Sequence, residues 1–191
     1  IGVRLVGSEM CIRDSYMHIG VDLQAIARAL MTNLKNYGKG KRLVGASTIT
    51  QQVAKNFLLS SEVTFERKIK EAILAIRIER AFSKKEILEL YLNEIYLGNN
   101  SYGIAAAALN YFDKSLDDLT IDEAAFLATL PKAPSKYNPK TNYERVLDRR
   151  NWVLNQMYKN GYLTKKEKNT LQSKEIILTK SSGLDGTSAP Y

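Results

Sequence analysis

The sequence of 191 residues is poor in the residues that build disulfides, multi-histidine metal centres and membrane spans. Its one cysteine, Cys11, excludes an internal disulfide. Its one histidine, His18, excludes a metal site built on several histidines, and a lone histidine is more often structural than catalytic. No apolar run approaches the roughly 20 residues of a membrane-spanning helix. We also find no secretory signal pattern, nucleophile elbow, phosphate-binding loop or dinucleotide fingerprint.

The composition predicts a globular chain with an anionic partner. Hydrophobic residues make up 45% and charged residues 25%, which is typical of a domain with a core. Lys and Arg number 28 against 20 Asp and Glu, a formal charge of +8. Such an excess favours nucleic acid, a phosphorylated metabolite or an acidic membrane surface. We expect no nucleic-acid partner, because zinc-finger spacing and RNA-binding aromatic signatures are absent. The basic stretch 35–42 suits contact with anionic lipid head groups.

The periodicity of apolar residues predicts an almost wholly helical fold. We expect helices over residues 21–36, 47–59, 64–82, 84–93 and 142–160, and capping boxes that start at Ser83, Thr120 and Thr164. The helix over 64–82 is predicted to be the longest. It should lie buried at the centre, because residues 72–78 are apolar on nearly all sides. Residues 175–179 are predicted to form a short strand.

Residues 45–56 (GASTITQQVAKN) contain the most unusual local composition of the chain. Ser, Thr and Asn are poor helix formers, since their side chains compete with the backbone for hydrogen bonds. Apolar residues nevertheless recur at helical spacing from Ile49, and Ser47 is the expected N-cap. The opposite face then carries Thr48, Gln52 and Lys55. A face so rich in hydrogen-bond donors suits a polar, anionic, sugar-like ligand.

A second candidate cluster consists of Arg67, Lys68 and Glu71. Lys68 and Glu71 are three residues apart, so they are neighbours on one helix face, which Ala75 and Glu79 continue. One interpretation is a surface ion pair worth about 0.2–0.5 kcal/mol. The other is a functional site, because a carboxylate at the edge of an apolar stretch needs a cation or a metal.

Four segments of the chain form a set of motifs. The segments are G-x-S-T-I-T-Q-Q-x-x-K-N at 45–56, R-K-x-x-E-x-x-x-A-x-x-x-E at 67–79, K-x-x-I-L-x-x-Y-L-N-x-x-Y-x-G at 84–98 and R-R-x-x-V-L-x-x-M at 149–157. Together they resemble glycosyltransferase family 51, the peptidoglycan glycosyltransferase domain of class A penicillin-binding proteins. The resemblance covers roughly residues 16–165, in the order and at the spacing of the family.

The resemblance implies a mainly α, lysozyme-like helical transglycosylase domain at the outer, periplasmic face of the bacterial cytoplasmic membrane. It implies polymerisation of lipid II into a glycan strand with inversion at the anomeric carbon, in a parent protein linked to a transpeptidase domain. It assigns a catalytic role to Glu71, which would also hold a divalent metal ion, Mg or Mn. The substrate-binding residues that it implies are Ser47, Thr48, Gln52, Lys55, Arg67 and Lys68.

The chain departs from the family upstream of Tyr16. The family's first motif, E-D-x-x-F-x-x-H-x-G, ends here at His18 and Gly20, but its general base falls at Cys11 and its aspartate at Ile12. A base must lie within hydrogen-bond reach of the proton it removes. We therefore hypothesise that residues 1–15 are a non-native scar and that activity is impaired. Residues 16–173 would form the domain and 174–191 the linker to the transpeptidase.

Two alternative functions stay open at this point. A lysozyme-like glycan hydrolase would use paired carboxylates beside a cleft and water as the nucleophile. A non-enzymatic, basic helical module would bind a membrane or nucleic acid, the latter with a steep dependence on salt. The dense cations around Lys55 and Lys68 favour a pyrophosphate substrate over the glycan of a hydrolase, and the binding module stays open.

Overall fold

The computed structural model describes residues 20–38, 40, 44–58 and 64–179, and these residues confirm the mainly α fold class. Loops join the helices, and within the described ranges the only β-type pairing is an isolated bridge between Tyr96 and Tyr102. The described residues divide into two compact units, 20–94 and 95–179, here called the N-terminal and the C-terminal unit. No helix in the described part of the chain is long and apolar enough to cross a membrane.

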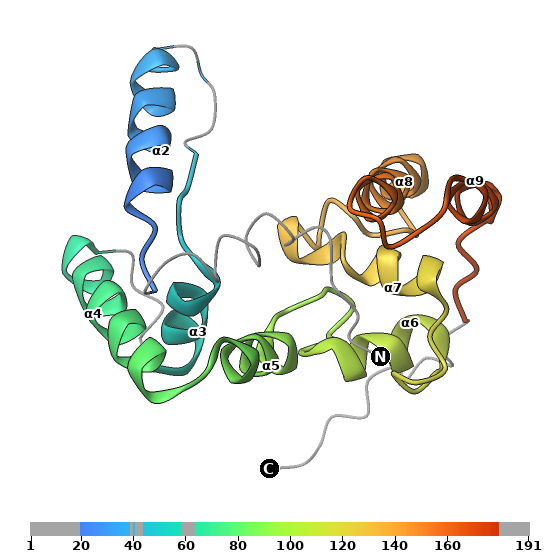
Figure 1. Ribbon diagram of the computed structural model, residues 1–191, viewed down its shortest axis with the longest axis horizontal. Helices are drawn as coiled ribbons and strands as arrows, with labels where there is room; N and C mark the ends of the chain where they lie inside the picture. Colours follow the sequence, from blue (N-terminus) through green and yellow to red (C-terminus); the bar gives the residue numbers. More distant parts are fainter. Residues whose placement is uncertain (1–19, 39, 41–43, 59–63, 180–191) are drawn as a thin grey trace. The chain divides into compact units, whose positions relative to one another are not determined.

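The N-terminal unit is built around its second helix, α3. This helix packs against both α4 and α5, so it forms the centre of the unit (Figure 1). Its buried side chains include Ile49 and Val53, which supports the predicted apolar stripe, and α5, on which it packs, buries Ile87 and Tyr91. The helices that the structure describes in this unit are α2 (Leu23–Lys35), α3 (Ile49–Leu58), α4 (Phe65–Ala81) and α5 (Lys84–Glu94).

The start of α3 differs from the prediction. The prediction of Ser47 as its N-cap is wrong, because Thr48 fills that role. The Gln51 backbone N–H donates to Thr48 Oγ1 at 3.1 Å, and the Thr48 backbone N–H donates to Gln51 Oε1 at 3.0 Å. This reciprocal pair is a capping box. The Ser47 hydroxyl is thereby left available for contacts with another helix.

The prediction that residues 64–82 form the longest, central and buried helix is wrong. Helix α4 has 17 residues, the same length as α8 in the other unit, and its covered strip consists of Glu71, Ala75 and the side chain of Glu79. Ile69 and Ile73 are each 48% exposed. The covered part of α4 is therefore a narrow strip. Ala75 lies in this strip, and its small side chain lets a neighbouring backbone approach closely.

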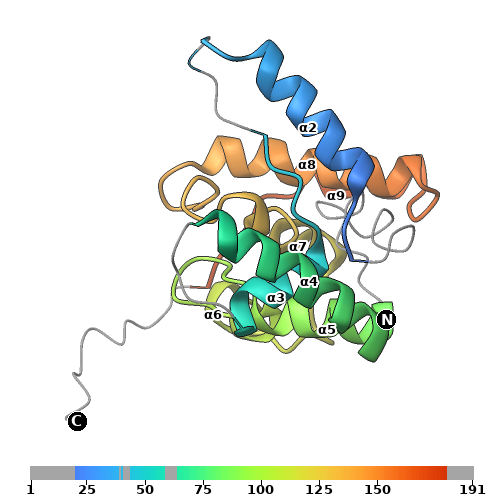
Figure 2. The ribbon, with the colours of Figure 1, turned by 90° about the vertical axis from the view of Figure 1, so that its left-hand side faces the viewer.

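Helix α2 also buries less than its pattern suggests. Its start is capped by Asp22, whose side chain accepts a hydrogen bond from the Ala25 backbone N–H. The apolar stripe continues to its end, yet Leu30 is 59% and Leu34 is 74% exposed. In both views α2 projects away from the other three helices of its unit (Figures 1 and 2). Ala29 is the buried residue of α2, and the described residues leave the Leu30 and Leu34 side chains largely uncovered.

The C-terminal unit has an aromatic core between α6 and α7. The Phe126 ring meets the rings of Tyr111 and Phe112 edge-on, with centroids 5.2 and 5.5 Å apart. Helix α7 packs on α8, and α8 packs on α9. The capping boxes at Thr120 and Thr164 are confirmed. The elements of this unit are α6 (Ile104–Phe112), α7 (Ile121–Leu127), the 3-10 turn η1 (Leu130–Lys132), α8 (Tyr143–Lys159) and α9 (Lys165–Ser173).

Residues 174–179 follow α9 as an extended segment, and the prediction of a strand there is wrong. The Ile176 backbone N–H donates to the Tyr143 hydroxyl at 3.1 Å, and the Thr179 backbone N–H donates to the Tyr111 carbonyl at 3.0 Å. These are single bonds to different helices rather than a ladder with one neighbouring strand. The segment is held across the surface of its own unit.

Candidate functional site

The clearest polar cluster of the N-terminal unit joins the start of α3 to the first turns of α4. Lys68 Nζ donates to Ser47 Oγ at 2.9 Å and to Glu71 Oε1 at 2.6 Å. The predicted contact between Lys68 and Glu71 is therefore confirmed, and Ser47 is joined to it. The cluster forms because residues three apart on a helix lie on one face, while the capping by Thr48 leaves Ser47 facing α4.

Glu71 is the most unusual member of this cluster, because it is a carboxylate that is 1% exposed. Its Oε1 atom accepts the Lys68 hydrogen bond, but its Oε2 atom is buried and has no hydrogen-bond partner among the described residues. Buried polar atoms are nearly always paired, and an exception in a folded protein calls for an explanation. An orphaned carboxylate oxygen beside a half-exposed lysine is suited to accept a ligand's proton or to coordinate a cation.

Three more predicted residues lie on the same pair of helices. Gln52 is half-buried and Lys55 exposed on α3, and Arg67 is half-buried on α4. Lys55, Arg67 and Lys68 provide three cations, on two helices that pack together, near the buried carboxylate of Glu71. The excess positive charge favours an anionic ligand.

Thr48 differs from the other predicted residues because it is buried. Its hydroxyl donates to the Gly20 carbonyl oxygen at 2.6 Å and accepts from the Gln51 N–H. Gly20 is the last residue of the first-motif resemblance, and Thr48 connects this one residue to α3. The other first-motif positions, including His18 and Cys11, lie outside the described residues.

The sequence alone assigned no role to a second buried carboxylate on α4. Glu79 Oε1 accepts from Thr50 Oγ1 and Glu79 Oε2 contacts Lys84 Nζ, both at 2.5 Å. Its side chain is 7% exposed, and Thr50 is wholly buried. The spacing of Glu71, Ala75 and Glu79 was the available signal, because residues four apart share a helix face.

A divalent cation fits the orphaned oxygen of Glu71 in part. The described residues contain no group of three or more His, Cys, Asp or Glu side chains that could enclose a metal. Mg²⁺, however, is commonly held by one or two carboxylates together with substrate phosphates and water. Glu71 could supply the protein ligand of such an arrangement, provided that the substrate supplies phosphate oxygens.

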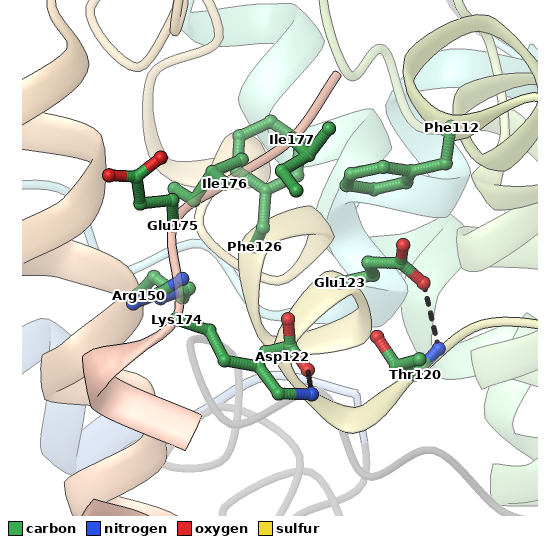
Figure 3. Close-up of a pocket in the computed structure, with 10 residues that line it drawn as sticks. All are labelled: Phe112, Thr120, Asp122, Glu123, Phe126, Arg150, Lys174, Glu175, Ile176 and Ile177. Carbon is green, nitrogen blue, oxygen red and sulfur yellow. Dashed lines mark hydrogen bonds and ion pairs between the residues drawn. The ribbon is translucent and has the colours of Figure 1, made fainter. Parts of the chain in front are cut away.

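The C-terminal unit contains a cavity of about 480 Å³, and none of the predicted site residues lines it. Figure 3 shows its apolar wall from Phe112, Ile176 and Ile177 and its acidic side from Asp122 and Glu123.

Arg150, which belongs to the R-R motif, also lines this cavity and is fully buried. Its Nη2 donates to Asn151 Oδ1 and to the Gln172 carbonyl oxygen, at 2.9 and 3.1 Å. Burial lowers the pKa of the guanidinium, and the charge of Asp122 opposes that shift. Arg150 therefore ties α8 to the end of α9.

Comparisons with known proteins agree with these motifs. The model of the Transglycosylase family matches residues 13–158. Penicillin-binding protein 1A of Rickettsia felis is 52% identical over 179 residues, which is 94% of this chain and 23% of that protein. Penicillin-binding protein 1A of Aquifex aeolicus is 52% identical over 170 residues, 89% of this chain and 23% of that protein. The chain thus spans about a quarter of the length of these relatives.

A crystal structure of penicillin-binding protein 1A from Haemophilus influenzae aligns with 52% of this chain and 15% of its own chain. The sequence identity is 49% and the TM-score is 0.49. The family match covers most of the chain and includes all the residues of the Ser47–Lys68–Glu71 cluster. The chain therefore belongs to the transglycosylase family, glycosyltransferase family 51, which forms the peptidoglycan glycosyltransferase domain of class A penicillin-binding proteins.

Proposed function

We propose that this chain binds the pyrophosphate-linked donor of a peptidoglycan glycosyltransferase, which polymerises lipid II into glycan strands. The observation that carries the proposal is the Ser47–Lys68–Glu71 cluster, in which a buried carboxylate keeps one oxygen unpartnered beside a half-exposed lysine. A site of this kind is costly to bury without a ligand. It is well matched to a ligand that brings both negative oxygens and a cation.

The reaction displaces a pyrophosphate from the anomeric carbon of the donor sugar. The oxygen of the acceptor's 4-hydroxyl forms the new bond to that carbon, and its proton passes to a carboxylate base. The bond between the carbon and the phosphate oxygen breaks, and its electron pair leaves with the lipid pyrophosphate. In-line displacement converts an α-linked donor into a β-linked product. The family's base falls at Cys11, so we expect the chain to bind donor better than it turns over.

The residues of the cluster act on the leaving group. Lys55, Arg67 and Lys68 provide fixed positive charge where negative charge develops on the pyrophosphate. Lys68 can exchange its hydrogen bond to Ser47 for one to a phosphate oxygen, because it is half-exposed. Glu71 would then orient the Lys68 ammonium through Oε1. A bound Mg²⁺ or Mn²⁺ at Oε2 would neutralise part of the pyrophosphate charge.

We further propose that the N-terminal unit works at a membrane surface, on the outer face of the bacterial cytoplasmic membrane. The support is helix α2, whose exposed leucines adjoin the basic residues Arg28 and Lys35. The donor carries a lipid tail, so a domain that processes it has to meet the bilayer. In the parent protein we expect a transpeptidase domain to follow this chain.

The first test separates donor binding from turnover. Titration of the 191-residue chain with farnesyl pyrophosphate and Mg²⁺ should give saturable binding, and Lys68→Met should weaken it at least about tenfold, since hydrogen bonds to charged groups contribute about 1.5–3 kcal/mol. The triple variant Cys11→Glu/Ile12→Asp/Ser15→Phe restores the first motif. We expect it to polymerise lipid II in detergent faster than the unaltered chain.

The controls decide between the proposed function and its rivals. Lys140→Met removes an exposed cation from the C-terminal unit and should leave farnesyl pyrophosphate binding unchanged. Equal binding by the Lys68→Met variant and the unaltered chain would contradict the proposed donor site. Release of muropeptides from purified peptidoglycan by the triple variant would instead identify a glycan hydrolase.

A further inference from the structure

We infer that Glu79 is a positioning residue of the donor site, which fixes helix α3 against helix α4 while Lys68 is free to engage the ligand. This inference rests on the function proposed above. Glu79 touches none of the predicted ligand-binding side chains in any contact described here. Its effect has to pass through the helices that carry them.

Glu79 connects three helices of the N-terminal unit. It lies on α4, accepts a hydrogen bond from Thr50 on α3 and forms an ion pair with Lys84 at the start of α5. Both carboxylate oxygens are used. Glu71 presents the opposite situation on the same face of the same helix, because one of its oxygens is unpartnered. One carboxylate is therefore committed to the fold, and the other is available to a ligand.

The backbone around Glu79 is tightly packed. A Cβ atom on Gly20 would lie 2.8 Å from the Ala75 carbonyl oxygen and 2.9 Å from Glu79 Cγ. Gly20 also has a φ of +91°, which few side-chain-bearing residues adopt. Its carbonyl oxygen is held by Thr48 at the start of α3. Gly20 itself therefore lies against α4 between Ala75 and Glu79.

The contact between Glu79 and Thr50 can hold α3 in place when a ligand is bound. Side-chain hydrogen bonds join α4 to the start of α3 at two places, where Lys68 donates to Ser47 and where Thr50 donates to Glu79. The first is exposed and is the one that a pyrophosphate would take over. The second is buried and can persist. Because an α-helix is rigid, holding Thr50 also fixes the directions of Gln52 and Lys55 on α3.

The test compares two changes at Thr50 in the 191-residue chain. Thr50→Val keeps the shape and removes the hydroxyl that Glu79 accepts, whereas Thr50→Ser keeps the hydroxyl. Small misplacements of binding groups cost up to about 100-fold in enzymes. We expect Thr50→Val to weaken binding of farnesyl pyrophosphate with Mg²⁺ about tenfold, and Thr50→Ser to restore it to within about threefold of the unaltered chain.

Two further variants keep the result interpretable. Lys114→Met breaks an ion pair with Glu123 in the C-terminal unit and should leave farnesyl pyrophosphate binding unchanged. If it weakened binding as well, the effect would come from a general loss of stability rather than from the donor site. Lys84→Met frees the second oxygen of Glu79 and should weaken binding as well. It provides the same test if Thr50→Val does not fold.

The outcomes distinguish the inference from the proposed function. If Thr50→Val and Lys84→Met bind like the unaltered chain while Lys68→Met does not, Glu79 supports the fold only and the positioning role is overturned. If Lys68→Met also binds like the unaltered chain, the donor site itself is in the wrong place, and both proposals fall. Weakening by Thr50→Val, rescue by Thr50→Ser and no effect of Lys114→Met support the positioning role.

Discussion

At the scale of single residues, the two buried carboxylates of α4 have opposite energetic roles. Glu71 is desolvated but only half satisfied, so in the absence of ligand it costs stability. Glu79 is desolvated and fully satisfied by Thr50 and Lys84, so its removal leaves buried partners unpaired. Natural binding sites often keep such costly groups, because the ligand supplies the missing partner.

The same substitution at the two positions should therefore have different effects. We expect Glu71→Gln to change the free energy of unfolding by less than about 0.5 kcal/mol or to raise it, because it removes a buried charge and keeps an acceptor for Lys68. We expect Glu79→Gln to lower it by about 2 kcal/mol, since one amide oxygen cannot serve both Thr50 and Lys84. Urea unfolding without ligand measures both changes, and equal losses at the two positions would contradict this assignment.

The sequence predicted side-chain contacts correctly where the geometry is local. Lys68 and Glu71 are neighbours because of helical spacing alone, and the sequence indicated this contact correctly. The prediction of Ser47 as the N-cap of α3 was wrong. Thr48 pairs with Gln51 and Ser47 contacts Lys68 on α4, and this choice depends on the packing of α4 against α3. The role of Glu79 could not be predicted from the sequence, because its partners Thr50 and Lys84 lie on other helices.

At the scale of elements, helix α2 is the part of the molecule whose sequence pattern and burial disagree. An amphipathic stripe normally faces the core. Here the stripe is exposed, and the helix packs little on its neighbours within the N-terminal unit. An exposed apolar face of this size on one helix is typical of contact with a membrane or another protein. The bilayer is the partner that the proposed lipid-linked substrate requires.

Vesicle binding tests this role of α2. We expect the chain to bind anionic vesicles more tightly than neutral ones, since each basic residue near the surface contributes about 1 kcal/mol. The double variant Leu30→Gln/Leu34→Gln should weaken binding at least about tenfold, because it removes apolar area from the exposed face. Cosedimentation measures both effects.

The matched control for α2 is the pair Leu109→Gln/Leu116→Gln. These leucines are also exposed, at 58% and 43%, but they lie in the C-terminal unit. Their replacement should leave vesicle binding unchanged. An equal loss for both pairs would show that binding depends on overall hydrophobicity rather than on the face of α2.

At the scale of the whole molecule, both units use the same device to start helices. Capping boxes begin α5, α7 and α9, and each contains a glutamate that accepts hydrogen bonds from the N-cap residue. Hydrogen bonds from the backbone and hydroxyl of Ser83 lower the pKa of Glu86, and those from Thr164 lower the pKa of Glu167.

The third of these glutamates, Glu123, is partly buried. Burial alone would raise the pKa of its carboxyl, but hydrogen bonds from Lys114 and Thr120, with the charge of Lys114, hold it below the ordinary value. All three boxes are therefore strongest when the glutamate is ionised. Acid should weaken the starts of three helices over the same pH range.

We predict that stability falls on acidification through these three groups. A carboxyl with a folded pKa below its unfolded value of about 4.3 contributes fully above that pH, and its contribution is lost as pH falls through the folded pKa. The triple variant Glu86→Gln/Glu123→Gln/Glu167→Gln keeps capping acceptors without the charge. Urea unfolding between pH 7 and pH 3 should show a shallower decline for this variant, and an equally steep decline would contradict the prediction.

The sequence by itself determined the helices of this protein, their capping boxes and the motifs that place the chain in its family. These features depend on residues three or four apart, and helical geometry brings such residues together wherever the helix lies. The tertiary structure alone decided which faces are buried, that Thr48 rather than Ser47 caps α3, and that Glu71 keeps an unpartnered oxygen while Glu79 keeps none. Burial and hydrogen-bond satisfaction depend on the remote segments that pack against a residue, and local spacing does not encode those partners.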